Sequence, residues 1–467
     1  MSATNTATPF QRECYIMAKP AGALCQLRCA YCYYLEKQGL YNSKLLSHKA
    51  NQPLDGSRLS SENSMQPING LLQPSNASPQ SANNSLQSSN DCPQSSEHSQ
   101  TQACVLSQQS LMMSDALLER YTQQYIEMQT TGHVLFVWHG GEPTLRPLSF
   151  YQRAMELQRK YAGGRHIENA LQTNGLRLTP EWCRFLRDNK WLVGISIDGP
   201  QSIHDAYRRD AQGRPTWQRV MEAIRMMQHY GVEWNAMAVV NNLNVKRPED
   251  FYRFFKKIGC HYIQFTPIVE RKASPDSGLL SPDEVGGRMT EMSVTPTEWG
   301  EFCCRVFDEW IKKDVGSTFV QLFDATLANW VGVTPGLCTM AKECGHAGVM
   351  EANGDLYSCD HFVFPAYRLG NIREHTLIEM MYGAKQSQFS ARKYKGLSQK
   401  CRQCQWQRVC HGECPKNRIL QDPQDLRPLN YLCEGYRMFF DHVAPKMNIM
   451  ANLYRQGLPP ADVMNFV

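Results

Sequence analysis

The sequence predicts an α/β protein in which a parallel sheet or partial barrel is followed by a cysteine-rich segment. Short runs of β-branched and aromatic residues alternate with longer helical stretches up to residue 270. Strands joined by crossover helices form a parallel sheet. From Leu337 to Cys433 the alternation stops, loops dominate and cysteines crowd together. This segment has too few apolar runs for a large core, so we expect bound metal to supply part of its folding free energy.

Six strands and five intervening helices are predicted. The strands are expected at Tyr15–Lys19, Val134–Trp138, Ile167–Thr173, Leu192–Ile197, Glu233–Val240 and His261–Thr266. The helices are expected at Asp115–Gln129, Ser149–Tyr161, Pro180–Asn189, Pro215–Tyr230 and Pro248–Ile258. Three of them begin with proline, which suits a first helical turn. Residues 296–331 are helical in pattern, and an amphipathic helix over Glu434–Tyr454 should pack back on the barrel.

The stretch from residue 42 to 109 interrupts this pattern. It is rich in Ser, Gln, Asn and Pro and includes Cys92 and Cys104, to which we assign no role. Such a composition cannot bury enough apolar area to offset chain entropy, which predicts a disordered insertion. The expected domains are a barrel (1–41 and 110–270), the insertion (42–109), a helical linker (271–336), a cysteine-rich domain (337–435) and a C-terminal helix (436–467).

Composition excludes several classes of protein. The chain has 467 residues, is 42% hydrophobic and carries a net charge of only +5 with no basic stripe, so we expect a large core and no nucleic-acid partner. No stretch approaches the roughly 20 apolar residues of a membrane span, and Met1–Phe10 lacks the pattern of a secretion signal. We therefore expect a cytoplasmic protein without a membrane partner. In a reduced compartment, its 18 cysteines indicate metal sites instead of disulfides.

Three cysteines directly follow the first predicted strand. Cys25, Cys29 and Cys32 lie within eight residues in the sequence C-Q-L-R-C-A-Y-C. Three thiolates on one tight loop can hold three irons of a [4Fe–4S] cube and leave the fourth iron open. Zinc is the alternative, with His48 as a conceivable fourth ligand. The loop's place at the carboxyl end of a barrel strand, where such sheets bind substrates, favours the iron–sulfur interpretation.

This C-x-x-x-C-x-x-C loop, with Tyr31 before its last cysteine, resembles the signature of the radical S-adenosylmethionine superfamily. The resemblance implies that the open iron chelates S-adenosylmethionine and that an electron from the cluster cleaves the sulfonium to give a 5′-deoxyadenosyl radical. It also implies that a G-G-E-P turn after the second strand contacts the methionine amino group. The cofactor-binding residues implied in this way are Tyr31, Gly140, Gly141, Glu142, Ser196, Arg208 and Val269.

The last three of these residues have separate implied roles. By the resemblance, Ser196 and Arg208 bind the ribose and carboxylate of the nucleoside, and Val269 lines the adenine pocket. Ser196 could equally be an ordinary turn residue. Arg208 could simply pair with Asp205 or Asp210.

The C-terminal cysteines follow the pattern C-x-x-C-x-x-x-x-x-C-x-x-x-C within a longer series of eight. Eight thiolates suffice for two [4Fe–4S] clusters or for two structural zincs, and the count does not decide between them. The series resembles the SPASM extension of peptide-modifying radical enzymes, which implies two auxiliary clusters. The implied ligands are Cys338, Cys344, Cys359 and Cys414 for one cluster, and Cys401, Cys404, Cys410 and Cys433 for the other.

With this resemblance the fold prediction becomes a partial (β/α)6 TIM-type barrel with a C-terminal SPASM domain, holding three [4Fe–4S] clusters and S-adenosylmethionine. The remaining cysteines lack ligand spacing and are expected to be buried or inert thiols. They are Cys14, Cys92, Cys104, Cys183, Cys260, Cys303 and Cys304.

The segment G-D-L-Y-S-C-D-H-F-V, in which Asp360 follows Cys359, is similar to that of the anaerobic sulfatase-maturating enzymes. The likeness covers nearly the whole chain except the insertion. It implies that Asp360 is the general base while a Cys or Ser of a sulfatase is oxidised to Cα-formylglycine. Implied partners are an unfolded or nascent sulfatase polypeptide and a reductant such as flavodoxin or ferredoxin, with the enzyme a monomer. One departure is His139, where relatives commonly have glutamine before G-G-E-P.

Three alternatives stay open. Asp360 could be a turn or cap residue that satisfies backbone donors. The chain could be a radical maturase that crosslinks a ribosomal peptide, although only about fourteen residues precede the first strand, too few for the peptide-recognition domain of many such enzymes. It could also be a non-enzymatic metal-cluster scaffold, which would leave the three-cysteine loop and the G-G-E-P turn unexplained.

Overall fold

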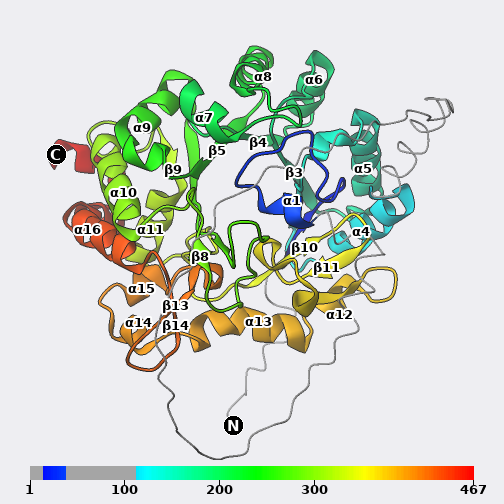
Figure 1. Ribbon diagram of the computed structural model, residues 1–467. Coiled ribbons are helices and arrows are strands. Elements are labelled where there is room, and N and C mark those ends of the chain that lie inside the picture. The colour runs from blue at the N-terminus through cyan, green and yellow to red at the C-terminus, as the bar shows by residue number, and fades with distance from the viewer. Residues whose placement is uncertain (1–13, 38–111, 467) are drawn as a thin grey trace, which may run out of the picture. The chain divides into compact units, whose positions relative to one another are not determined.

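The computed structural model describes residues 14–37 and 112–466, which lie in one compact unit (Figure 1). The predicted insertion at 42–109, with His48, Cys92 and Cys104, lies outside the described residues, as does Met1–Phe10. Among the described residues, no helix is both long enough and apolar enough to cross a membrane.

A ten-stranded sheet organises the unit, in the order β12-β11-β10-β1-β2-β3-β4-β5-β6-β9. Its centre consists of β1 (Cys14–Ala18), β2 (His133–Trp138), β3 (His166–Thr173), β4 (Leu192–Ser196), β5 (Trp234–Val240) and β6 (Tyr262–Pro267). Each of these strands is parallel to its neighbours. The predicted α/β class and parallel sheet are confirmed, and every predicted strand lies within one residue of the observed one at either end.

Helices cover the outer face of these strands, as the arc of helices in Figure 1 shows. They are α4 (Asp115–Glu127), α5 (Leu148–Tyr161), α6 (Pro180–Asp188), α7 (Gln201–Tyr207), α8 (Trp217–Tyr230) and α9 (Pro248–Lys257). Alternate residues of β2, such as Phe136 and Trp138, point toward them and are fully buried. Burying a side chain of this size contributes roughly 1.5–3 kcal/mol, so alternation along the strands fixes which face is covered.

Two helix predictions need correction. Pro215 does not start a helix, because it pairs with Arg209 in an isolated β-bridge and α8 begins only at Trp217. The helical pattern over 296–331 is two helices, α10 (Pro296–Trp310) and α11 (Gln321–Val331), separated by β9 (Phe319–Val320). β9 pairs with β6 and thereby interrupts the helical run.

The C-terminal helix α16 (Cys433–Arg455) packs against α10 and α11. The two long helices approach closely where Gly300 faces Gly435. A Cβ atom on Gly435 would lie 2.1 Å from the carbonyl oxygen of Pro296, which explains why glycine stands there.

The cysteine-rich segment contributes its own strands to the main sheet, which the sequence did not predict. They are β10 (His346–Met350), β11 (Asp355–Tyr357) and β12 (Arg368–Asn371). β10 is parallel to β1, and β11 and β12 continue the sheet antiparallel. The barrel and this segment therefore share one sheet.

The remaining helices and strands have two to twelve residues each. They are α1 (Tyr33–Lys37), β7 (Arg271–Lys272), β8 (Arg288–Met289), α12 (Leu377–Met381), α13 (Ala384–Lys395), α14 (Gln399–Gln403), α15 (Gln407–Cys410), β13 (Leu420–Gln421) and β14 (Pro428–Leu429).

Candidate active site

The three-cysteine loop lies between β1 and α1, at the carboxyl end of the sheet. Burial, together with neighbouring charges, raises the pKa of both the Cys25 and the Cys29 thiols to about 12. Cys32 lies close enough to both to contribute to these shifts. Buried thiols of this kind become thiolates only when a cation compensates the charge, and three of them on one loop fit three irons of a cube.

The paired glycines of G-G-E-P bring the loop after β2 against the cysteine loop. The N–H of Gly141 donates to the carbonyl of Gly22 at 2.8 Å, and the N–H of Glu142 donates to that of Leu24 at 2.7 Å. A Cβ atom on Gly141 would lie 2.2 Å from the Leu24 carbonyl oxygen, and Gly140 has a φ of 127°. Only glycine permits both features, so this turn positions the segment directly preceding Cys25.

Glu142 joins the ends of β2 and β3 from a fully buried position. Its carboxylate accepts hydrogen bonds from the Thr144 N–H at 2.9 Å, the Thr173 hydroxyl at 2.7 Å and the Asn174 N–H at 2.8 Å. Burial raises the pKa of Glu142, although these donors oppose the shift. The structure thus holds Glu142 rigidly beside the cysteine loop, and Asn174 in turn places its amide nitrogen 3.7 Å from the Cys25 sulfur.

The residues expected to bind the nucleoside lie at the carboxyl ends of later strands. Ser196 ends β4 and accepts a hydrogen bond from Gln172 at 3.0 Å. Arg208 pairs with neither Asp205 nor Asp210. Its Nε donates to Asp198 at 2.9 Å.

Asp198 is buried, and no motif of the sequence singles it out. It accepts hydrogen bonds from Tyr31 and Arg208 and from the Val239 N–H, so it links the cysteine loop to β4 and β5. Its position shortly after the end of the parallel strand β4 is the feature of the sequence that could have identified it as a site residue. Val269 is buried beyond β6, and its carbonyl accepts a hydrogen bond from Lys416 at 2.8 Å.

The C-terminal cysteines lie in two groups. Burial, Glu413 and the nearby thiols of Cys338, Cys359 and Cys344 raise the pKa of Cys414. The second group lines a single cavity of about 390 Å³, which contains Cys401, Cys404, Cys410 and Cys433. A chamber with four converging thiols and no carboxylate among its lining residues fits a fully ligated iron–sulfur cluster.

Asp360 is brought from the C-terminal segment to the cysteine loop. It starts a short 3-10 helix after Cys359, and its side chain is only 16% exposed. One carboxylate oxygen accepts hydrogen bonds from the Tyr33 hydroxyl at 2.6 Å and the Tyr34 hydroxyl at 2.5 Å. Both tyrosines directly follow Cys32, so Asp360 lies between the two cysteine-rich parts of the chain.

A buried lysine balances the charge of this carboxylate. The Nζ of Lys19 lies 2.6 Å from Asp360 and 2.8 Å from Glu351, and its side chain is 1% exposed. Burial alone would raise the pKa of Asp360, but the charges of Lys19 and Lys37 outweigh it and hold the pKa well below its usual range. Burial also lowers the pKa of Lys37 to about 8. Asp360 is therefore a carboxylate at neutral pH.

His139 closes the same cluster. Its ring lies 5.9 Å from that of Tyr34, and its Nδ1 accepts a hydrogen bond from the Gly140 N–H at 2.7 Å. Burial lowers its pKa, so the ring is neutral near pH 7. The sequence does not reveal Lys19 and Glu351 as site residues, because each is an ordinary charged residue at a strand end.

Comparison with known proteins agrees with this geometry. Residues 108–255 match the profile of the Radical SAM superfamily, and residues 343–405 match SPASM, an iron–sulfur cluster-binding domain. The serine-type anaerobic sulfatase-maturating enzyme of Bacteroides thetaiotaomicron is 48% identical over 467 residues, covering 99% of this chain and 97% of that one. This chain belongs to the anaerobic sulfatase-maturating enzymes.

Other members of the family are also similar to this sulfatase-maturating enzyme. A cysteine-type enzyme of Clostridium perfringens is 32% identical, over 73% of this chain and 89% of its own. The solved structure of native anSMEcpe with bound AdoMet and Cp18Cys peptide has a TM-score of 0.71 and 27% identity, and covers 94% of this chain and 98% of that one. The predicted family, fold class and enzymatic nature are confirmed. The predicted cofactors, [4Fe–4S] clusters and S-adenosylmethionine, are confirmed.

Proposed function

We propose that this enzyme oxidises a Ser or Cys side chain of a sulfatase polypeptide to Cα-formylglycine. The observation that carries the proposal is the position of Asp360, an ionised carboxylate bonded to the tyrosines that follow Cys32 and adjacent in sequence to Cys359. Hydrogen abstraction, proton acceptance and electron removal must all occur near one substrate carbon. The contacts of Asp360 with Tyr33 and Tyr34, and its position directly after Cys359, support the role of proton acceptor for this residue.

The chain's own residues would hold the cofactors as the family resemblance implies. Cys25, Cys29 and Cys32 would ligate the cluster that binds S-adenosylmethionine. Tyr31, Gly140, Gly141, Glu142, Ser196, Arg208 and Val269 would surround the nucleoside and the methionine. The two four-cysteine groups would ligate the auxiliary clusters. When bound, these groups supply hydrogen-atom abstraction and one-electron transfer.

In this proposal Asp360 accepts the proton that the substrate side chain loses. Converting a CβH₂–OH or CβH₂–SH side chain to a C=O or C=S group removes one hydrogen atom, one proton and one electron. A carboxylate that is already ionised can take the proton, and the hydroxyls of Tyr33 and Tyr34 fix its orientation. For a cysteine substrate, water then replaces sulfur and releases hydrogen sulfide. Both residue types reach the same aldehyde.

Several finer expectations belong to the same proposal. The electron would come from a small donor such as flavodoxin or ferredoxin, and the enzyme would act as a monomer in the cytoplasm. The domain boundaries at residues 41, 110, 270, 336 and 435 stay predictions. The substrate would be an unfolded or nascent sulfatase, because the target side chain must reach Asp360.

An Asp360→Asn variant tests the proposal. The cluster-loaded enzyme is incubated anaerobically with reductant, S-adenosylmethionine and a synthetic peptide bearing the sulfatase Ser or Cys. Chromatography measures 5′-deoxyadenosine and mass spectrometry measures formylglycine. We expect Asp360→Asn to keep cleaving the cofactor while formylglycine falls by about 10²–10⁴-fold.

A matched control is Asp308→Asn, which alters an exposed carboxylate paired with His442. This variant should behave like the wild type. Unchanged formylglycine per 5′-deoxyadenosine in Asp360→Asn would reduce Asp360 to a structural residue. A crosslinked peptide instead of an aldehyde would favour the ribosomal-peptide alternative, and absence of 5′-deoxyadenosine would favour the scaffold.

A further inference from the structure

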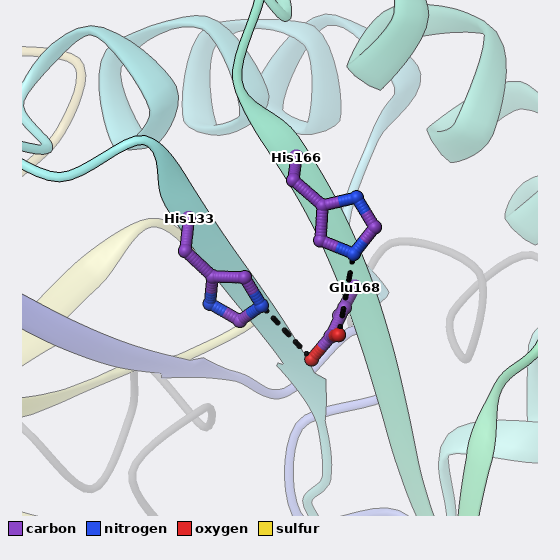
Figure 2. A group of neighbouring side chains, drawn as sticks. All are labelled: His133, His166 and Glu168. Atoms are coloured by element: carbon purple, nitrogen blue, oxygen red, sulfur yellow. Dashed lines mark hydrogen bonds and ion pairs between the residues drawn. The ribbon is translucent and has the colours of Figure 1, made fainter.

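Three exposed side chains that the reaction does not use converge at the opposite end of the sheet from the cysteine loop. His133 is the first residue of β2, and His166 and Glu168 are the first and third residues of β3. Figure 2 shows the three side chains pointing toward one another from these two neighbouring strands.

The strand register explains the convergence. β2 and β3 are parallel, and His133 is the direct partner of His166 in the ladder. Side chains alternate between the two faces of a strand, so Glu168 lies on the same face as His166 two residues earlier. The imidazole rings have centroids 5.4 Å apart, and the carboxylate lies between them. The pairing of β2 with β3 thus brings the three side chains together.

The distances within the cluster match a metal coordination shell. His133 Nε2 lies 3.1 Å from one oxygen of Glu168, and His166 Nε2 lies 3.3 Å from the other. The nitrogen atoms and the carboxylate lie within 4.8 Å of one another. A tetrahedral zinc ion with bonds of about 2.0–2.1 Å separates its ligands by about 3.3 Å. Small rotations of the exposed side chains would bring all three onto one ion.

We propose that His133, His166 and Glu168 form a binding site for a divalent transition metal, with zinc as the ion that the two imidazoles and one carboxylate suit best. Water completes the fourth position. The site is distinct from the cysteine groups, which are soft sulfur sites at the other end of the barrel and in the C-terminal segment. Because the site lies at the amino ends of β2 and β3, a metal bound there would hold these two strands together.

The alternative is a hydrogen-bonded pair of histidines on one carboxylate without metal. The chain contains a natural comparator for that case, because His442 Nε2 lies 2.7 Å from the Asp308 carboxylate on the surface with one imidazole only. Two donors hold zinc much more weakly than three. A variant of His442 therefore controls for general zinc binding to exposed histidines.

The test uses the enzyme with its iron–sulfur clusters loaded, so that the cysteines are occupied. Zinc chloride is added anaerobically, loosely bound metal is removed over a weak chelator, and zinc and iron are measured per chain. We expect about one zinc in the wild type and in His442→Gln. We expect His166→Gln and Glu168→Gln to bind zinc at least about tenfold more weakly, with unchanged iron.

Zinc X-ray absorption supplies a second readout, since nitrogen and oxygen scatterers support the site. Sulfur scatterers would place the ion on cysteines and overturn the proposal. Equal zinc retention by the wild type and His166→Gln, or no retention by either, would overturn it as well. Neither readout depends on formylglycine formation, so this proposal and the proposed function fail separately.

Discussion

Replacing Lys19 by methionine, which keeps the length of the side chain and removes its charge, tests the electrostatics around Asp360. Lys19 pairs with Asp360 at 2.6 Å and with Glu351 at 2.8 Å while almost wholly buried. At an effective dielectric constant of about 20, one such pair is worth about 4 kcal/mol at 4 Å separation. Losing the shared cation leaves two carboxylates facing each other, and breaking a buried pair in this way costs about 3–5 kcal/mol.

The loss should appear in both stability and chemistry. Anaerobic denaturant unfolding should show Lys19→Met to be destabilised by about 3–5 kcal/mol. One carboxylate of the pair should bind a proton to relieve the repulsion, so less Asp360 is available to accept the substrate proton. Lys19→Met should therefore still form 5′-deoxyadenosine but yield several-fold less formylglycine for each one formed.

A compensating variant separates charge from fold. Lys19→Met combined with Glu351→Gln removes one positive and one negative charge, so it should regain more than half of the lost stability and part of the product yield. If Lys19→Met gave the wild-type ratio of formylglycine to 5′-deoxyadenosine, Lys19 would not control Asp360 and this reasoning would be wrong.

Three further predictions concern other parts of the site. Gly141→Ala would place a Cβ atom 2.2 Å from a backbone carbonyl oxygen, a strain of about 3 kcal/mol that should lower 5′-deoxyadenosine formation at least tenfold. Gly132→Ala is the control, because a Cβ atom there has no atom within 4 Å and should leave 5′-deoxyadenosine formation unchanged. Burial lowers the pKa of His204 to about 4, against about 6.5 when unfolded. This contribution to stability is therefore full well above pH 6.5 and falls by about 1.3 kcal/mol between pH 7.5 and 5.5, as the unfolded state binds the proton. Hydrogen exchange of α7, which contains His204, should show this loss of stability in the wild type. An equal loss of stability in His204→Gln would contradict the prediction. Cys414→Ala should lose up to about a third of the bound iron, while Cys183→Ala, a buried thiol without ligand spacing, should lose none.

Much of the barrel could be predicted because its signals are local. Alternation of buried residues marks several of the central strands, as Phe136 and Trp138 illustrate on β2. The cysteine groups could also be predicted, since ligands to one cluster recur at short intervals. Pro215 misled the prediction because proline suits both a helix start and an extended bridge, and only its pairing with Arg209 decides between them.

The polar partners at the site could not be predicted, because they depend on contacts between distant segments. Asp198 is the exception that the sequence could have yielded: it directly follows β4, and the carboxyl ends of parallel strands converge. By contrast, nothing near Arg208 in the sequence distinguishes Asp198 from Asp205 or Asp210 as its partner. Three aspartates lie within ten residues of it, and only the fold selects among them.

The pairing of β1 with β10 explains why the acid–base group lies in the C-terminal segment. Ala18 is the partner of Met350 in this parallel ladder, and the Lys19 N–H donates to the Met350 carbonyl at 2.9 Å. Lys19 and Glu351 directly follow these two partners in their chains and therefore lie side by side, which creates the Lys19–Glu351 ion pair. After a short turn β11 runs antiparallel to β10, and the segment that follows β11 brings Asp360 to within 2.6 Å of Lys19. One register between segments more than 300 residues apart thus places the carboxylate beside the cysteine loop, and a slip of one residue would turn Glu351 away from Lys19.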